Sequence, residues 1–285
     1  MTTASTYRIL LAAATGVIIL AAIFLQQTGI VKPSCIGANS ITTQYGDITI
    51  CTTIPPTPDN VMLYWVVPQE NDTAFYFSGT FFASGPNVTS EAEAPLASDN
   101  ALLSYGGLPA DAQLSSVETQ YIETYNTKTH QVTDREPVST TVQFYRNISG
   151  IPVGGEGGFI RIELGENGEL LYLNKVWHTI EPAGTAQVIP VSIAIEKIER
   201  GELLGHRPKC NCELNVDKIQ LGYYEREKYE SQEFLEPVWV FAGTLSSGDR
   251  WEYYVPAREG SSLITSASSS TDEAVTVEQT VPVIK

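Results

Sequence analysis

Cationic side chains are scarce in this chain of 285 residues. The sequence contains 17 lysines and arginines and 33 aspartates and glutamates, which gives a formal net charge of −16 at pH 7. A charge of this sign and size repels phosphate backbones and anionic lipid headgroups alike. We therefore expect no nucleic-acid partner and interpret the acidity as that of a solvated, self-repelling surface.

The motifs that mark common enzyme classes are missing. The three histidines, His130, His178 and His206, show neither HExxH nor another metal-ligand spacing. No G-x-S-x-G elbow is present. The glycine-rich stretch 150–158 lacks the Lys-Ser/Thr of a P-loop and precedes a strand-like segment, so we predict a flexible turn there. We expect no enzymatic activity, no metal and no cofactor, with an envelope hydrolase whose Ser, His and Asp converge in space as a remaining alternative.

Only four cysteines occur, and they fall into two pairs along the chain. Cys35 and Cys51 are separated by a short loop, and Cys210 and Cys212 flank a single residue. Three connectivities are open. We favour a Cys35–Cys51 disulfide, with Cys210 and Cys212 either bridged to each other or free, and we expect an oxidising compartment.

One long hydrophobic run lies near the N-terminus. The uncharged residues from Ile9 to Leu25 would span roughly 26 Å as a helix, close to a hydrocarbon core of about 30 Å. Either a membrane anchor or a cleaved signal peptide fits, and the bulky Ile23, Phe24 and Leu25 after the alanines favour an uncleaved anchor. With Arg8 before the run, the positive-inside rule places the N-terminus in the cytoplasm and the bulk of the chain outside the cell membrane.

Three N-x-S/T sequons agree with an exterior location. They begin at Asn71, Asn87 and Asn147, and each has a middle residue other than proline. We take all three as candidate glycosylation sites.

Composition divides the chain into five predicted parts. The membrane anchor, 1–31, is followed by a proline-rich stalk with the first cysteine pair, 32–60. Next come an N-terminal α+β domain, 61–180, and a C-terminal α+β domain, 181–258. A flexible tail rich in serine and threonine, 259–285, ends the chain.

Within the first predicted domain, aromatic and β-branched residues at 62–67 and 75–82 predict a hairpin. Ser90, with Glu93 three positions later, predicts the start of a helix over 90–105. Alternating residues 159–164 and the following 169–177, joined at Asn167-Gly168, predict a second hairpin.

Within the second predicted domain, a loop at 181–190 separates the halves, and residues 191–203 show helical spacing. Strands are predicted at 216–226, 236–245 and 250–257, the last two joined by the polar turn at 246–249. The fold class expected from this order is α+β, with the N-terminal transmembrane helix followed by antiparallel sheets that are each packed by a helix, and with two related halves.

Aromatic residues gather in the last third of the chain. Strand alternation would turn some of them outward beside Glu225, Glu227 and Glu230, which makes an acidic aromatic strip the candidate partner surface. The four residues chosen for it are Tyr224, Trp251, Tyr253 and Tyr254. Ordinary sheet packing with tyrosine hydroxyls at the rim is the alternative.

The same region resembles a known module. A helix ending at glycine is followed by KIQLGYYE, then LEPVWVFAG, a turn and WEYYVPA, and this order is similar to PepSY-like modules of the YycH/YycI-type and YpeB-type extracytoplasmic regulatory proteins. The stretch 144–170 also resembles their strand and turn pattern, with Asn147, Gly150 and Gly154 at the turns. The resemblance covers 108–257 and carries no partner-contact residues.

The resemblance implies one N-terminal anchor, helix-on-sheet modules and a non-catalytic binding or regulatory role at the cell envelope. Members of that family are associated with restraining peptidases or modulating membrane sensor kinases. We accordingly expect contact with an envelope or membrane protein, or sensing of a ligand, with homo-oligomers as a further option. The alternative is a structural cell-surface glycoprotein or envelope assembly component.

Overall fold

The computed structural model describes residues 39–43, 46–69, 72–80, 87–206, 208, 210 and 212–263. The chain divides into a short unit, Met1–Asn39, and a long unit, Ser40–Lys285. The predicted anchor, Cys35, Asn71 and the tail beyond Leu263 lie outside the described residues. Within them, neither α-helix is long and apolar enough to cross a lipid bilayer.

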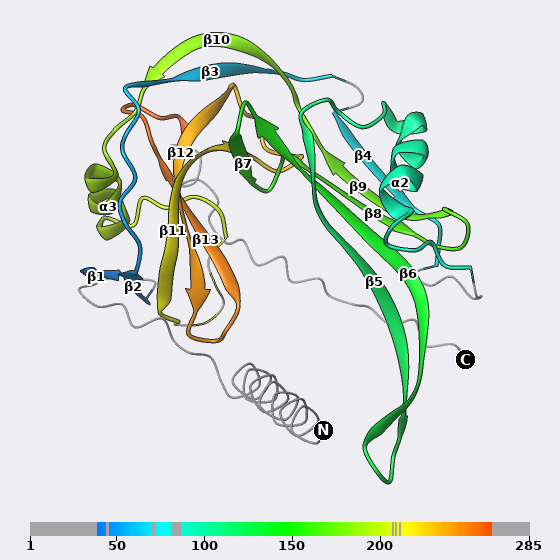
Figure 1. The fold of residues 1–285 in the computed structure, drawn as a ribbon. Helices are drawn as coiled ribbons and strands as arrows, with labels where there is room; N and C mark the ends of the chain where they lie inside the picture. The colour runs from blue at the N-terminus through cyan, green and yellow to red at the C-terminus, as the bar shows by residue number, and fades with distance from the viewer. Residues whose placement is uncertain are drawn as a thin grey trace, which may run out of the picture. The chain divides into compact units, whose positions relative to one another are not determined.

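Strands dominate the described part of the long unit (Figure 1). Thirteen strands join in one sheet, in the order β10-β3-β12-β11-β7-β6-β8-β9-β4 with the others attached at its sides. Their bounds are β1 Asn39–Thr43, β2 Gly46–Ile50, β3 Asn60–Val67, β4 Thr73–Phe77, β5 Ala112–Asn126, β6 Gln131–Ile148, β7 Ile151–Gly155, β8 Phe159–Leu164, β9 Leu170–Val176, β10 Thr179–Gln187, β11 Leu214–Glu225, β12 Phe234–Leu245 and β13 Arg250–Pro256. The helices are α2 (Ala94–Leu102), the 3₁₀ turn η1 (Leu103–Tyr105) and α3 (Val191–Glu199).

The predicted fold class is therefore wrong. Instead of PepSY-like antiparallel sheets that are each packed by a helix, the chain forms one large mixed sheet with two short α-helices. The sheet is mixed because β11 runs parallel to both β2 and β7 while it pairs antiparallel with β12. Helix α2 starts only at Ala94, next to Pro95, and its nine residues cover the middle of the predicted 90–105 helix, which begins with a turn and ends as 3₁₀ structure.

Several local predictions can be compared with the strands directly. The second predicted hairpin is β8–β9, with Asn167 and Gly168 both at positive φ in the turn. The hairpin predicted over 62–82 is wrong: β3 pairs with β10 and β12, whereas β4 pairs with β9. The loop predicted at 181–190 is largely strand β10, because a register shift between Pro182 and Gly184 accommodates the proline, which has no N–H for the ladder.

A first core lies between α3 and the β11–β13 strands. Its largest fully buried members include Trp239, Tyr223 and Phe241. The Trp239 Nε1 donates a hydrogen bond to the carbonyl oxygen of Ile189 (2.9 Å), which ties β12 to the start of α3. Strand β2 joins this core through Ile48, so this part of the predicted stalk belongs to the folded body.

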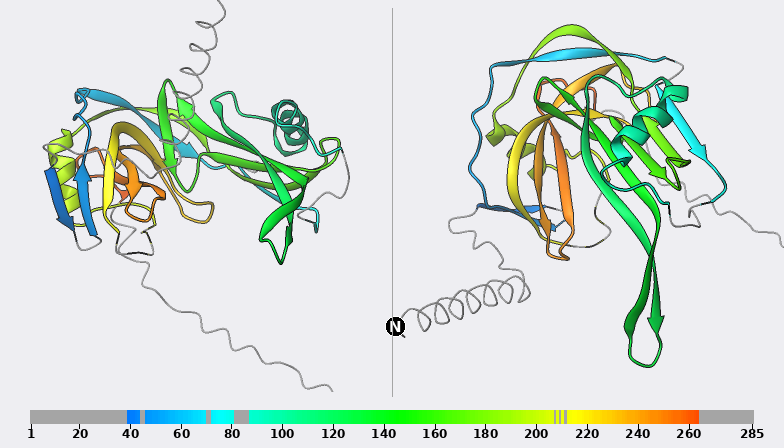
Figure 2. Two further views of the ribbon diagram at one scale, coloured as in Figure 1. Left: turned by 60° about the horizontal axis from the view of Figure 1, so that its bottom comes forward. Right: turned by 45° about the vertical axis from the view of Figure 1, so that its right-hand side comes forward.

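A second core lies under α2, against β6, β8 and β9. Ile160, Ile162 and Leu173 are fully buried on the face that α2 covers, together with Leu102 of the helix. Figures 1 and 2 show α2 lying against one face of these strands. Within the described residues the second core has no helix on its other face, which leaves that face to side chains and loops.

Candidate binding surfaces

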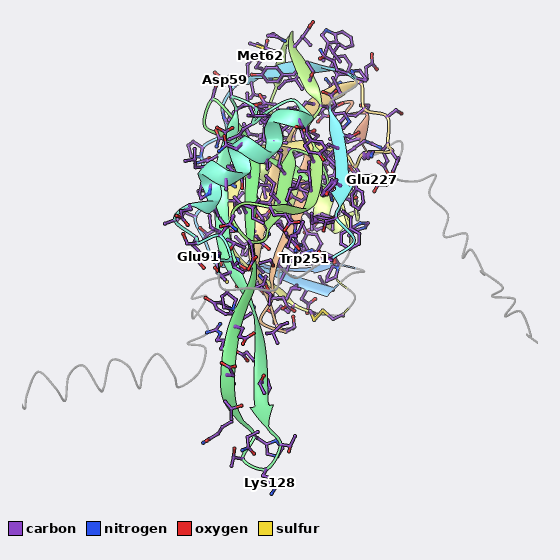
Figure 3. All side chains as sticks on the ribbon, turned by 90° about the vertical axis from the view of Figure 1, so that its right-hand side faces the viewer. Asp59, Met62, Glu91, Lys128, Glu227 and Trp251 are labelled. Atoms are coloured by element: carbon purple, nitrogen blue, oxygen red, sulfur yellow. A yellow bond between two sulfur atoms is a disulfide. The ribbon has the colours of Figure 1, made fainter. Side chains whose placement is uncertain are left out.

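A long hairpin extends beyond the rest of the sheet (Figures 1 and 3). Strands β5 and β6 pair from Ala112 and Arg146 at the base to Asn126 and Gln131 at the tip. Strand β8 lies beside β6 only from Thr140 to Tyr145. The part from Gln120 to Ser139 is therefore two-stranded, and we call it the arm. A two-stranded ribbon buries little apolar area and is at best marginally stable in water, so the arm contributes little to the core.

One face of the arm carries a connected tyrosine cluster. The guanidinium of Arg135 lies 3.9 Å from the ring centroid of Tyr121, and its Nε lies 3.3 Å from Glu123 Oε1. The Tyr125 hydroxyl donates to Glu123 Oε2 at 2.6 Å, and this bond together with the charge of Glu123 raises the pKa of Tyr125. Tyr121 and Tyr125 remain 42% and 56% exposed, and Ile122 and Val132 are exposed as well.

This arrangement is suited to protein contact. Tyrosine and arginine are enriched among residues that dominate binding energies at interfaces. Because Arg135 and Glu123 hold the two rings in place, less side-chain entropy is lost on binding.

The sheet face opposite α2 forms a second exposed surface. Residues paired across neighbouring strands share a face, and one such row runs Gln143, Arg161, Asn174 and Phe75. A second row contains Tyr145 and Phe159. Phe75 is 63% exposed, which is unusual for an aromatic side chain in a sheet.

Two cavities lie along this face, and a third continues them onto β7 and β11–β13. The first, of about 450 Å³, lies between Phe75 and Phe159 on the sheet and Glu156, Glu227 and Tyr229 on the loops. Phe159 also lines the second, of about 300 Å³, and Tyr145 links that one to a third of about 450 Å³ that reaches Tyr254. We call this row of cavities the groove.

Negative charge gathers at the first cavity of the groove. Burial raises the pKa of Glu156, His206 opposes this effect from 3.1 Å, and the charges of Glu227 and Glu230 raise it further. The ring of Tyr229 is 84% exposed, and Lys228 lies over it at 5.4 Å. The cavity therefore combines aromatic walls with carboxylates that repel one another.

The four residues predicted as a partner surface do not form one open strip. Tyr253 is buried in the first core, with Trp251 packed against that core. Tyr224 and Tyr254 point to the opposite face, where their rings pack at 5.4 Å in a small third cluster with Val238, Val240 and Leu204. Burial, with nearby carboxylates, raises the pKa of both tyrosines, and of the four only Tyr254 lines the groove.

Glu225, expected at the surface, instead lies in a buried network between the two cores. It is 0% exposed, and its Oε2 accepts from Arg146 Nη1 at 2.7 Å. Its Oε1 accepts from the backbone N–H of His178 at 3.0 Å and lies 2.9 Å from His178 Nδ1. Arg146 also donates to the carbonyl oxygen of His178 at 2.6 Å and lies 3.0 Å from Asp111. The network joins β6 of the second core to β11 of the first, and its geometry is that of a structural link.

The glycine-rich segment packs directly on this network. The residues predicted as a flexible turn include strand β7, and Glu156 and Gly157 donate backbone hydrogen bonds to the carbonyl oxygen of Glu225. A Cβ at Gly157 would lie 2.5 Å from the carbonyl oxygen of Arg226. Glycine is required there by close backbone approach.

The remaining predicted site residues are dispersed. Cys210 and Cys212 form a disulfide, and no free cysteine occurs among the cysteines that the structure describes. The preferred Cys35–Cys51 bridge stays a prediction. Asn87 is exposed, and Asn147 is half-buried at the β6–β7 turn, where its Oδ1 accepts from Gly150 N–H.

Sequence reasoning missed the arm and the buried network. The arm had a signal in residues 114–140, where threonine, valine and tyrosine recur on both sides of the turn sequence NTKTH. The Arg146–Glu225 pair had none, because 79 residues separate its members.

Comparison with known proteins adds little. The sequence matches no protein-family model and no curated protein. Among solved structures, the chain is similar to an uncharacterized protein from Eubacterium rectale ATCC 33656, with a TM-score of 0.35 and 10% sequence identity. The similarity covers 79% of this chain and 92% of that one. A likeness at this level carries no argument about the function of either protein.

Proposed function

We propose that this chain is a membrane-anchored, extracytoplasmic binding or regulatory protein that acts without catalysis, through contact with an envelope or membrane protein. In this proposal the N-terminal hydrophobic run is the anchor and the long unit is presented outside the membrane. The arm makes the contact.

The observation that carries the proposal is the exposed, internally organised tyrosine face of the arm. No residue of the arm belongs to the three hydrophobic clusters: Val117 and Val142, which do, lie just beyond its base, and within the arm Val138 is buried at that end. A strand pair that packs so little against its own chain gains stability if its exposed rings are buried against another molecule.

The test is an affinity pull-down of the full-length protein, solubilised from its native membrane, followed by mass spectrometry. Replacing both Tyr121 and Tyr125 by alanine should remove a stoichiometric partner while the fold is retained. The matched control is Leu96→Ala, which removes an exposed apolar side chain from α2. A partner that is retained by the arm variant, or the recovery of the bait alone, would contradict the proposal.

A second candidate is a structural cell-surface glycoprotein. The exposed side chain of Asn87 and the exposed Ser149 of the Asn147 sequon favour it. Glycopeptide mass spectrometry would test whether the asparagines carry glycans, and electron microscopy of native envelopes would test for ordered arrays. Glycosylated arrays without any second protein would favour this function over the first.

A further inference from the structure

We propose that the groove binds a cationic peptide segment of a partner protein, at a site separate from the arm. The inference goes beyond the proposed function, because it assigns a second surface and the chemistry of its ligand.

The dimensions of the groove fit an elongated ligand. Three cavities follow one another, linked by Phe159 and Tyr145, so the space exceeds that needed for one side chain. Side-chain amides of Gln143 and Asn174 line it from the sheet. An amide both donates and accepts, and it can therefore pair with the main chain of an extended peptide.

The charge of the groove favours a cation. Glu156 and Glu227 line the first cavity, and Glu252 lines the third. Two of the positive groups at the groove lie against carboxylates: Arg161 donates to Glu163 at 2.6 Å, and His206 Nε2 lies 3.1 Å from Glu156. A third, Lys228, lines the first cavity over the ring of Tyr229, so the two carboxylates there exceed the lysine charge by one. A net charge of −16 adds long-range attraction for a basic segment.

The aromatic walls of the first cavity favour a basic side chain over a small metal cation. Phe75, Phe159 and Tyr229 line the first cavity, and Phe75 and Tyr229 are mostly exposed. The Lys228 ammonium, 5.4 Å from the Tyr229 ring centroid, shows that such a ring accepts a cation here. A guanidinium or ammonium group on an apolar stem can pack on such rings while a carboxylate neutralises it. A small metal cation would leave the apolar rings without a packing partner. An arginine or lysine side chain contacts both the rings, through its apolar stem, and the carboxylates, through its charged group.

The experiment measures fluorescence anisotropy with the full-length protein in detergent. The probe is a fluorescein-labelled peptide of alternating valine and arginine, and its twin carries glutamate in place of arginine. The basic peptide should bind and the acidic twin should not. Replacing Glu156 and Glu227 together by glutamine should weaken binding about tenfold or more, since the variant loses both carboxylate partners of the basic side chain.

The matched control is the Glu196→Gln and Glu199→Gln pair, which removes the same charge from the exposed face of α3. Its affinity for the basic peptide should stay within about twofold of the unmodified protein. Equal weakening by both pairs, or no binding at all, would overturn the proposal, because the first outcome indicates attraction by net charge alone.

The alanine variant at Tyr121 and Tyr125 separates this inference from the proposed function. It should bind the basic peptide with unchanged affinity. Loss of peptide binding in that variant would place the peptide on the arm and overturn the assignment to the groove. Loss of the native partner with retained peptide binding would support two separate sites.

Discussion

The two cores of the long unit differ in how their strands are covered. Around the first core, β12 is buried on both faces, with Trp239 and Phe241 on one side and Val238 and Val240 on the other. In the second core, the sheet is covered by α2 on one face and lined by the groove on the other. The first region is a framework, whereas the second combines a core with exposed surface. The arm and the sheet side of the first two cavities belong to strands of the second region, and the third cavity is lined mainly by β7 and β11–β13.

The link between the two regions should be the most sensitive point. Replacing Arg146 by alanine leaves Glu225 as a buried charge without its main partner, and we expect a loss of about 3–5 kcal/mol in the free energy of unfolding. Urea denaturation followed by circular dichroism would measure this loss. The control is Arg135→Ala on the arm, which breaks an exposed Arg–Glu pair and should cost less than about 1 kcal/mol. Equal effects of the two variants would show that the buried network does not join the cores.

The two faces of the second sheet should respond differently to truncation. Leu102→Ala creates a cavity under α2 and should cost about 2–5 kcal/mol. Phe75→Ala removes a larger side chain from the open face and should change stability by less than about 0.5 kcal/mol. Both are measured by thermal unfolding. A large loss for Phe75→Ala would mean that the open face is packed in solution.

Limited proteolysis should distinguish the arm from the framework. Lys128 lies exposed at the arm tip, labelled in Figure 3, whereas Lys175 and Lys197 are buried. Opening the arm costs little of the global stability, so trypsin should cleave after Lys128 well before either buried lysine. Mass spectrometry of the first fragments gives the order. Early cleavage at Lys197 would contradict the view that the first core is the stable framework.

The smallest expected effect concerns the groove. Burial raises the pKa of Glu156 above its ordinary value, so the folded state holds the proton more tightly than the unfolded chain. The contribution of this proton to the free energy of unfolding is fully present below the ordinary carboxyl pKa. It is lost as the pH rises through the raised pKa of Glu156. Glu156→Gln should abolish this dependence and leave the protein slightly more stable at neutral pH. Denaturation midpoints from pH 4 to pH 8 test it, and an unchanged profile in the variant would contradict it.

Local sequence patterns predicted the local pairings. The β8–β9 hairpin follows from the alternation of 159–164 and from Asn167-Gly168, and the β12–β13 hairpin follows from two aromatic strands around a short polar turn. Helix α3 lies within the predicted segment and ends before Gly201. Each of these elements depends on residues within about 25 positions of one another, where turn chemistry and periodicity act.

The candidate surfaces could not be predicted in the same way. Alternation correctly places Tyr253 and Tyr254 on opposite faces of β13. It does not predict that α3 and β2 cover the face with Tyr253, or that Tyr224 and Leu263 cover the face with Tyr254. The hairpin expected over 62–82 failed for the same reason, since β3 and β4 find partners far along the chain in β10 and β9. Non-local pairing depends on which surfaces are complementary, and sequence spacing carries no measure of that.

By itself the sequence determined the acidity, the two helices to within a few residues, the local hairpins, and the places where sequons, cysteines and an N-terminal hydrophobic run occur. The tertiary structure decided that the strands form one mixed sheet, that Glu225 is buried against Arg146, and that the arm and the groove are exposed. The physical reason is that propensity and periodicity are properties of short segments. Burial instead depends on which distant segments pack together to remove apolar surface from water.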